Sequence, residues 1–254
     1  DARYLKLVAK TVSGVLGLPG RKVQSVAQAS FDAWVKYYRS DENTPNSTIS
    51  YYAKGSLVAL ALDLVLRSQS AQKGSLDDVM RRLWAASGGG PISEDDIRGA
   101  LRDVAGRSVD DELQAFVHGT GDLPLPELLE RAGVQWQAQP PTAAQRLGLR
   151  VSESALTGVK VSHVLRGGAA EQAGVSSGDD LLAVADWRIR RLDDALRLLQ
   201  PGVPGTLLLS RDQRVLTLPI TLPKDDGAVG AVMLTPDAKA PRAAQALRKA
   251  WLGG

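Results

Sequence analysis

The chain has 254 residues, of which 44% are hydrophobic and 23% charged, and its formal net charge is +3. This composition is typical of a globular protein with room for two cores, and the basic residues are spread along the chain, which argues against nucleic acid as a partner. No apolar run reaches membrane-spanning length, and the absence of Cys excludes disulfides and thiolate metal sites while leaving the compartment open.

The first part of the chain carries helical patterns. The stretch "DARYLKLVAKTVSGVL" (1–16) repeats apolar residues at helical spacing, and Pro19-Gly20 then ends the pattern. A second helix is predicted over "SVAQASFDAWVKYY" (25–38). The residues expected to face inward on these helices are Tyr4, Leu5, Val8, Val12 and Val15, then Phe31, Trp34 and Val35.

A central helix is predicted at 55–66, where Leu, Val and Ala occur nearly all round the helical surface. Three Ser-x-x-Asp patterns follow, each typical of a helix start because the Ser oxygen accepts an amide hydrogen of the first turn. The patterns are Ser75 with Asp78, Ser93 with Asp96, and Ser108 with Asp111. Gly106 is placed to end the second of these helices, and a short helix is expected after the prolines of "GTGDLPLPELLERAGV" (119–134).

The pattern then changes across "QAQPPTAAQ" (137–145), where two prolines keep the backbone extended. From residue 147 onward, short apolar or alternating runs come with turn residues every ten or so positions, and two short helical segments interrupt them. This succession predicts a small, partly open β-barrel with two helices. A last amphipathic helix is expected within "DAKAPRAAQALRKAWLGG" (237–254).

Two motifs in this second part resemble a bacterial PDZ domain. "AAEQAGVSSGDDLLAV" (169–184) matches the family's Ala-x-x-Ala-Gly-Φ-x-x-Gly-Asp-x-Φ segment, where Φ is apolar. "RLGL" (146–149) is similar to the loop whose backbone amides bind a peptide C-terminal carboxylate in that family. The resemblance covers residues 143–222 and implies a PDZ fold.

Peptide capture is one of two functions that this module allows. A groove beside an exposed strand edge accepts an extended peptide as an additional strand, and bare amides in a turn bind an anion. The residues expected to form this site are Arg146, Leu147, Gly148 and Leu149 in the loop, and Leu192, Ala195 and Leu199 along the groove wall. The alternative is that these residues are core and that the module only packs on its neighbour. The sequence leaves both open.

A longer stretch, "PGRKVQSVAQASFDAWVKYYRSDENTPNSTISYYAKGSLVALALDLVLR" (19–67), resembles the glycyl aminopeptidase family. These are bacterial zinc peptidases with a thermolysin-like helical catalytic domain and a C-terminal PDZ domain. "SLDDVMRRLW" (75–84) and "DDELQAFVHGTGDLPLPELL" (110–129) continue the resemblance, and the order of modules agrees. The resemblance implies hydrolysis of N-terminal Gly or Ala from peptides.

The same resemblance implies zinc in the intact enzyme, yet the family's His-Glu-x-x-His motif is not in this sequence. The chain has His118 and His163, neither followed by Glu nor spaced from a second His on a helix. Because a catalytic zinc needs three protein ligands, we expect this chain to bind no metal and to be inactive alone. We therefore interpret it as the C-terminal part of such an enzyme, whose partner is the missing N-terminal part.

Two adjacent tyrosines precede the central helix. From the residues alone, a packed ring with a locally bonded hydroxyl is the simpler interpretation. The resemblance reverses it, since in related zinc aminopeptidases the tyrosine of a Tyr-x-Lys-Gly step donates a hydrogen bond to the developing oxyanion. Tyr52-Ala53-Lys54-Gly55 matches this step, so Tyr52 is the implied catalytic residue and Tyr51 the alternative. Lys54 could line the same site, but the simpler expectation is that it extends along the surface with its amine in water.

The predicted fold class is α+β multidomain, with the N-terminal all-α part of a thermolysin-like peptidase domain followed by a PDZ-like small β-barrel. The expected divisions are 1–121 helical, 122–142 linker, 143–222 PDZ domain, and 223–254 a tail with an amphipathic helix. Because upstream segments of the family would cover the 55–66 helix, exposed apolar surface or homo-oligomers are expected. The expected ligand is a peptide substrate or a peptide C-terminus.

Overall fold

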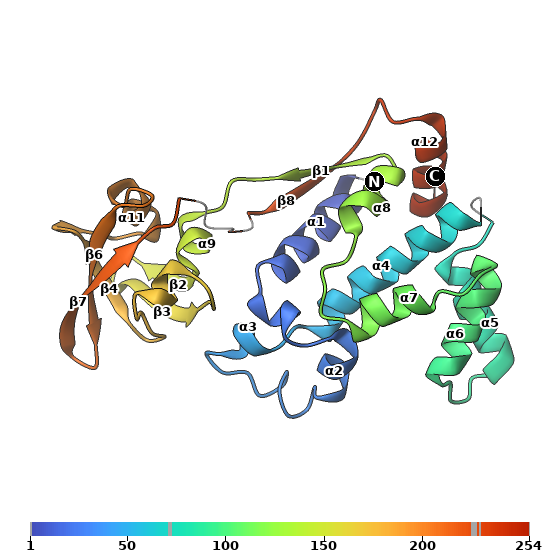
Figure 1. Cartoon of the computed structure of the whole chain (residues 1–254), viewed down its shortest axis with the longest axis horizontal. Helices are drawn as coiled ribbons and strands as arrows, with labels where there is room; N and C mark the ends of the chain where they lie inside the picture. The colour runs from blue at the N-terminus through green and yellow to red at the C-terminus, as the bar shows by residue number, and fades with distance from the viewer. Residues whose placement is uncertain (1, 71–72, 225–227, 229, 254) are drawn as a thin grey trace.

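The computed structural model of the chain describes residues 2–70, 73–224, 228 and 230–253. A larger helical part lies beside a smaller β-rich part along the long axis, and both ends of the chain belong to the helical part (Figure 1). The combination confirms the expected α+β multidomain class.

The helical part contains most of the helices. They are α1 (Ala2–Leu16), η1 (Pro19–Lys22), α2 (Val26–Phe31), α3 (Thr44–Ser47), α4 (Tyr51–Gln69), α5 (Leu76–Ser87), α6 (Glu94–Ala105), α7 (Asp110–Leu113), η2 (Gln114–His118), α8 (Leu125–Arg131) and, after the β-rich part, α12 (Arg242–Leu252). Here η1 is a 3-10 helix and η2 a π-helical turn. The helix expected from the first residue is confirmed as α1, although Asp1 itself lies outside the described residues.

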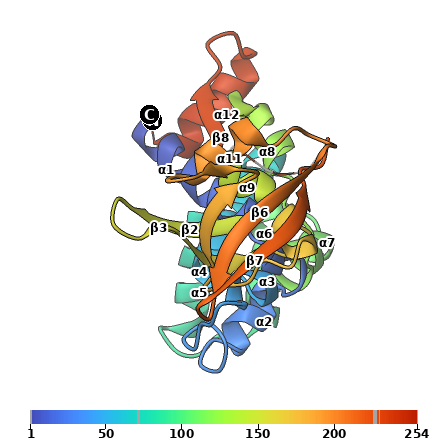
Figure 2. The same ribbon diagram turned by 90° about the vertical axis from the view of Figure 1, so that its left-hand side faces the viewer.

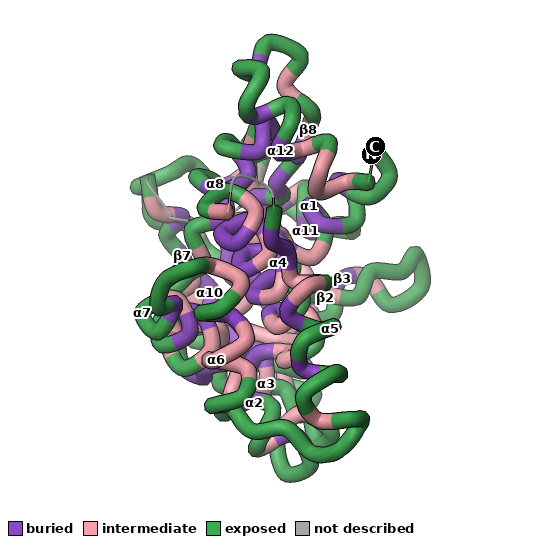
Figure 3. Tube along the Cα trace, turned by 90° about the vertical axis from the view of Figure 1, so that its right-hand side faces the viewer, coloured by how far each residue is buried: buried purple, intermediate pink, exposed green. Residues whose placement is uncertain are grey.

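Helix α4 is the centre of this part, and residues all round it are buried. It packs against α1, α2, α5, α6, α8 and α12, and the buried positions gather around it in Figure 3. The expectation of an uncovered 55–66 helix is therefore wrong, because segments of this chain cover it. The buried residues from Leu57 to Leu66 are Leu57, Val58, Leu60, Ala61, Leu62, Leu64, Val65 and Leu66.

The stretch Thr44–Gln69 has a mean hydropathy of 1.4 over its most apolar window. By length and composition alone, it is the one stretch among the described residues that is long and apolar enough to cross a membrane. Core helices of globular proteins have the same length and composition. In the fold, 56% of that window is buried inside the protein, which is the pattern of a core helix.

The predicted second helix is shorter than expected. Helix α2 ends at Phe31 because the chain turns at Asp32, whose carboxylate accepts hydrogen bonds from Gln24 and Lys36. Phe31 and Trp34 are 90% and 79% exposed instead of facing inward, and Val35 is exposed as well. The turns after α2 carry two tyrosines, Tyr37 and Tyr38, back over the start of α4.

Two of the three predicted helix starts are confirmed as capping boxes, Ser75 with Asp78 and Ser93 with Asp96. The third differs, since the Ser108 hydroxyl bonds Asp110 at 2.6 Å and Val109 takes the capping position. Gly106 ends α6 in the left-handed region, at φ 72°, as the sequence predicts.

Two short strands join the helical part to the β-rich part. Strand β1 (Val134–Ala138) pairs antiparallel with β8 (Val232–Pro236), with Trp136 opposite Leu234. Val232 and Leu234 are buried in the core of the helical part, to which α12 adds Leu247. The β-rich part is therefore an insertion between β1 and β8.

The stretch expected as a linker, 122–142, contains α8 and β1. Within the stretch expected as a tail, 223–254, residues 225–227, 229 and 254 lie outside the described residues.

The inserted part contains the segment predicted to be a PDZ domain, and we refer to it by that name. It contains α9 (Ala143–Leu147), β2 (Leu149–Ser154), β3 (Gly158–Val164), α10 (Ala169–Gln172), β4 (Asp180–Val184), β5 (Trp187–Arg188), α11 (Leu192–Leu198), β6 (Pro204–Arg211) and β7 (Arg214–Thr221). Its antiparallel sheet has the order β2-β3-β4-β6-β7, with β5 paired to β4. Figure 2 looks onto this part, with β6 and β7 in front. The domain has a hydrophobic core of its own.

One buried amide connects the two parts. The Asn46 side chain, next to the end of α3, is 6% exposed. Its Nδ2 donates to the Val164 carbonyl at 2.8 Å, and its Oδ1 accepts from the Arg166 amide at 2.8 Å. Because the amide satisfies a donor and an acceptor on the same PDZ strand end, it fixes the position of that end against the helical part.

We predict that Asn46→Ala loosens this connection. Both PDZ backbone groups lose their partner, which costs roughly 1–3 kcal/mol where the groups stay shielded from water. Hydrogen exchange should show faster exchange of the Arg166 amide. Asn43→Ala is the matched control. The Asn43 side chain accepts a hydrogen bond from Asn46, and it has no hydrogen bond to the described residues of the PDZ domain. Equal protection of the Arg166 amide in Asn46→Ala and wild type would contradict the assignment.

Candidate functional site

Four tyrosines meet at the start of α4. Tyr51 and Tyr52 come from its first turn, and Tyr37 and Tyr38 come from the turns after α2. The Tyr38 hydroxyl lies 3.1 Å from the Tyr51 hydroxyl and 3.2 Å from the Tyr52 hydroxyl, so it bonds both. We call these four residues the tyrosine cluster.

Ring packing holds the cluster together. The Tyr51 and Tyr52 rings lie 4.2 Å apart between centroids, and the Tyr37 ring meets Tyr51 and Tyr38 edge-on at 5.5 and 5.3 Å. Ser50 caps α4 by accepting from the Ala53 amide, and its hydroxyl donates to Tyr37 at 3.3 Å. The cap and the rings therefore orient the same helix end.

The two helix tyrosines differ in exposure and in acidity. Tyr52 is 61% exposed, whereas Tyr51 is half-buried. Hydrogen bonds with Tyr38 and Tyr51 lower the pKa of Tyr52, and hydrogen bonds with Tyr38 and Tyr52 raise the pKa of Tyr51. An exposed neutral phenol at the positive end of a 19-residue helix is suited to donate a hydrogen bond to a developing oxyanion.

Lys54 is buried, not extended into water as expected. It is 2% exposed, and its Nζ donates to the Arg21 carbonyl at 3.3 Å. An ion pair between Arg21 and Asp122 (2.7 Å) lies nearby, and a largely apolar cavity of about 120 Å³ is lined by Lys54 together with Trp136. Burial lowers the pKa of Lys54, which Asp122 opposes and Arg21 reinforces.

No group of three His, Cys, Asp or Glu side chains among the described residues is placed to hold a metal ion. His118 Nε2 bonds Glu94 at 2.9 Å, and His163, on β3, contacts the neighbouring Ser162 at 3.1 Å. These residues do not form a zinc site, so we derive no zinc-dependent step from this chain.

In the PDZ loop that was expected to bind a peptide carboxylate, backbone amides already donate hydrogen bonds within the protein. The Arg146 amide donates to Thr142, and the Gly148 amide donates to carbonyls of α9. Gly148 has φ 73°, and a Cβ there would lie 2.8 Å from the Gly168 Cα, so the position requires glycine. In this structure the loop is the end of α9 and not an open turn of bare amides.

The proposed groove walls are also packed. Leu147, Leu149, Leu192, Ala195 and Leu199 are all buried in the PDZ core, and α9 packs on α11. Strand β2 lies at the edge of its sheet and pairs with β3 alone among the described strands. The edge needed for adding a peptide strand is thus present, whereas the apolar wall residues are occupied as core.

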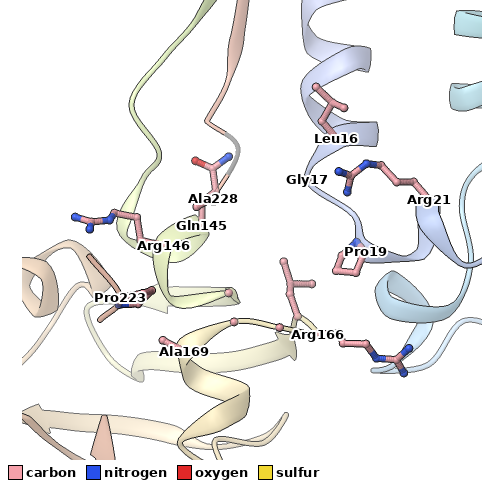
Figure 4. A pocket seen from close by; sticks show the side chains of 14 residues that line it. Leu16, Gly17, Pro19, Arg21, Gln145, Arg146, Arg166, Ala169, Pro223 and Ala228 are labelled. Carbon is pink, nitrogen blue, oxygen red and sulfur yellow. The ribbon is translucent and has the colours of Figure 1, made fainter. Parts of the chain in front are cut away.

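A cavity of about 200 Å³ lies between the two parts of the chain (Figure 4). Leu16, Gly17, Pro19 and Arg21 line it from the helical part, and the loops at 145–148 and 165–169 line it from the PDZ domain. The Arg146 side chain points away from this cavity. The proposed PDZ loop therefore faces the helical part with its backbone.

Sequence reasoning found two of the four clustered tyrosines and missed the contribution of Tyr38. The sequence signal for the cluster is that all five tyrosines fall within the first 52 residues. A helix running to residue 38 would have carried Tyr38 away from Tyr52, and it is the turn at Asp32 that brings their hydroxyls together.

Two family models match the chain: M61 glycyl aminopeptidase over residues 1–58 and PDZ domain over residues 135–201. The crystal structure of an aminopeptidase N family protein from Idiomarina loihiensis matches with a TM-score of 0.85 and 31% identity, over 99% of this chain and 44% of that chain. The chain thus spans less than half of that protein's length. It resembles the C-terminal part of an M61 peptidase with a PDZ domain.

The crystal structure of a serine endoprotease from Yersinia pestis matches 30% of this chain and 28% of its own at 26% identity, with a TM-score of only 0.27. No curated protein matches the sequence.

We predict that the stability of the fold rises with pH through Lys54. A lysine whose folded pKa lies below its ordinary 10.5 is more protonated in the unfolded chain, so unfolding becomes less favourable as pH rises toward 10.5. Lys54→Met should lose this rise and be at least as stable as wild type at neutral pH, because no ammonium is buried. Urea unfolding at several pH values measures both effects. Parallel pH curves for the two proteins would contradict the assignment.

Proposed function

We propose that this chain supplies a transition-state-stabilising tyrosine and a PDZ domain to a zinc aminopeptidase of glycyl aminopeptidase type, which removes N-terminal Gly or Ala from peptides. The observation that carries the proposal is the exposed Tyr52 at the start of α4, inside the segment similar to that family. The zinc ligands belong to polypeptide outside this chain, and the chain alone is inactive.

Tyr52 acts on the carbonyl oxygen of the scissile peptide bond. As water adds to the carbon, negative charge builds on this oxygen, and a donor fixed in advance stabilises the transition state more than the substrate. A phenol is neutral at pH 7, so it offers its proton without burying a charge. Tyr51, half-buried beneath its neighbour, is the weaker candidate for the same task.

Tyr52→Phe in the longer enzyme that contains this chain should lower kcat about a hundredfold on glycine p-nitroanilide, the usual loss for one oxyanion donor. The substitution removes one hydroxyl from a residue that is 61% exposed, so the unfolding midpoint should change little. Tyr4→Phe is the matched control, because Tyr4 lies on α1 against Trp251. A kcat equal to that of wild type would remove the assignment.

The same substrate series tests the specificity. Glycine and alanine anilides should be cleaved faster than the leucine anilide, and the isolated chain with added zinc should cleave none of them. Turnover by the isolated chain would refute its proposed role as a contributor to a larger site.

A second candidate function is peptide binding by the PDZ domain itself, with no catalysis. The free edge of β2 favours it, since an extended peptide adds there as a strand and its C-terminal carboxylate reaches the loop of Arg146, Leu147 and Gly148. Binding at that loop requires α9 to release the Gly148 amide from its present carbonyl partners.

Titration of the chain with peptides that differ only at the C-terminus decides this second function. A free carboxylate should bind at least about tenfold more tightly than the amidated peptide, the difference expected for one lost charge-assisted hydrogen bond. Equal affinities, or no binding of either peptide, would leave the PDZ domain as a packing module.

A further inference from the structure

We propose that Tyr38 is a positioning residue for Tyr52: its hydroxyl accepts from Tyr51 and donates to Tyr52, which leaves the Tyr52 proton free for the substrate oxygen. The inference rests on the proposed function. In this arrangement Tyr38, from the turns after α2, orients the hydroxyl of Tyr52 on α4 through a hydrogen bond.

Proton counting restricts the possible arrangements. Each phenol has one proton to donate, and Tyr38 lies within hydrogen-bond distance of both partners. Tyr38 therefore donates to one partner and accepts from the other, or it accepts from both. Only donation from Tyr38 to Tyr52 leaves the Tyr52 proton unused within the cluster. The chain of donors then runs from Tyr51 to Tyr38 to Tyr52 and ends at the exposed hydroxyl.

Exposure and acidity both agree with this direction. Tyr52 is the exposed member of the helix pair, so its proton reaches a ligand, whereas the Tyr51 ring is half-buried. Hydrogen bonds with Tyr38 and Tyr51 lower the pKa of Tyr52, and hydrogen bonds with Tyr38 and Tyr52 raise the pKa of Tyr51, the directions expected when Tyr52 accepts and Tyr51 donates. A phenol that accepts one hydrogen bond donates a stronger one, since consecutive bonds polarise each other.

The surroundings of Tyr38 hold its hydroxyl in place. Its amide donates to the Ala33 carbonyl at 3.0 Å, and its ring lies between Trp34 at 5.2 Å and Tyr37 at 5.3 Å. These contacts restrict the motion of the Tyr38 ring, although the residue is 51% exposed. They also give a reason for the exposed Trp34, which packs on the outer side of the cluster.

Tyrosine-labelled NMR titration of the whole chain tests the donor order directly. In Tyr38→Phe, the pKa of Tyr52 should rise toward its ordinary 10.0 and that of Tyr51 should fall. Tyr37→Phe is the matched control: its ring contacts the cluster, but its hydroxyl pairs with Ser50, so both values should stay as in wild type. An unchanged Tyr52 pKa in Tyr38→Phe would overturn the proposal.

Tyr51→Phe provides a second variant should Tyr38→Phe lose its fold. Removing the first donor should raise the pKa of Tyr52, because Tyr52 loses its own hydrogen bond with Tyr51 and Tyr38 then donates a weaker bond. A fall in that pKa would mean that the donor order runs the other way.

Kinetics of the longer enzyme separate this inference from the proposed function. Tyr38→Phe should lower kcat by less than the roughly hundredfold loss of Tyr52→Phe, leave KM unchanged, and add nothing in a Tyr52→Phe background. If Tyr52→Phe keeps full activity, the proposed function fails while the NMR result still decides the donor order. Additive losses in the double variant would contradict positioning through Tyr52.

Discussion

Burial of α4 is the constraint on which the rest of the structure depends. A helix that is apolar nearly all round has no face to turn toward water, so it must be covered on every side. No single neighbouring segment does this. The cover includes α1 from the first residues of the chain and α12 from the last, and the Arg67 guanidinium of α4 donates to the Ala250 carbonyl of α12 at 2.9 Å.

This requirement explains the chain path. After α8 the chain leaves the helical core, builds the PDZ domain and returns through β8, so that α12 completes the cover of α4. The β1–β8 ladder fixes where it returns, and Asn46 fixes the near side of the PDZ domain. The PDZ domain is thus held at two places, its strand connection and the loop that leads into α4.

The sequence predicted the elements whose signal is local. Helical spacing identified α1 and α4, Ser-x-x-Asp identified two capped starts, and the Gly-Asp motif identified the PDZ domain. It missed the β1–β8 pairing, because two five-residue strands separated by a whole domain leave no local pattern. It also placed Trp34 inside, since helical spacing alone does not reveal that the helix stops at Phe31.

In the candidate site, too, the residues with a local sequence signal were predicted and those placed by tertiary structure were not. Tyr51 and Tyr52 were found from their position before an apolar helix, whereas the Tyr38 link depends on a turn that only the folded chain defines. Lys54 was misplaced because a charged residue near a helix end is usually solvated. The burial of Lys54 follows from its position two residues after Tyr52 on the same helix.

At 3.6 residues per turn, positions two apart on a helix point about 200° apart. Tyr52 and Lys54 therefore face nearly opposite ways, and when the phenol faces outward the lysine must face the core. There its ammonium donates to the carbonyl of Arg21 in η1. Gly55 has no comparable steric role, since a Cβ there would meet Val26 at an ordinary 3.8 Å. In this fold, the lysine of the Tyr-x-Lys-Gly step is a core residue of the helix end that presents the tyrosine.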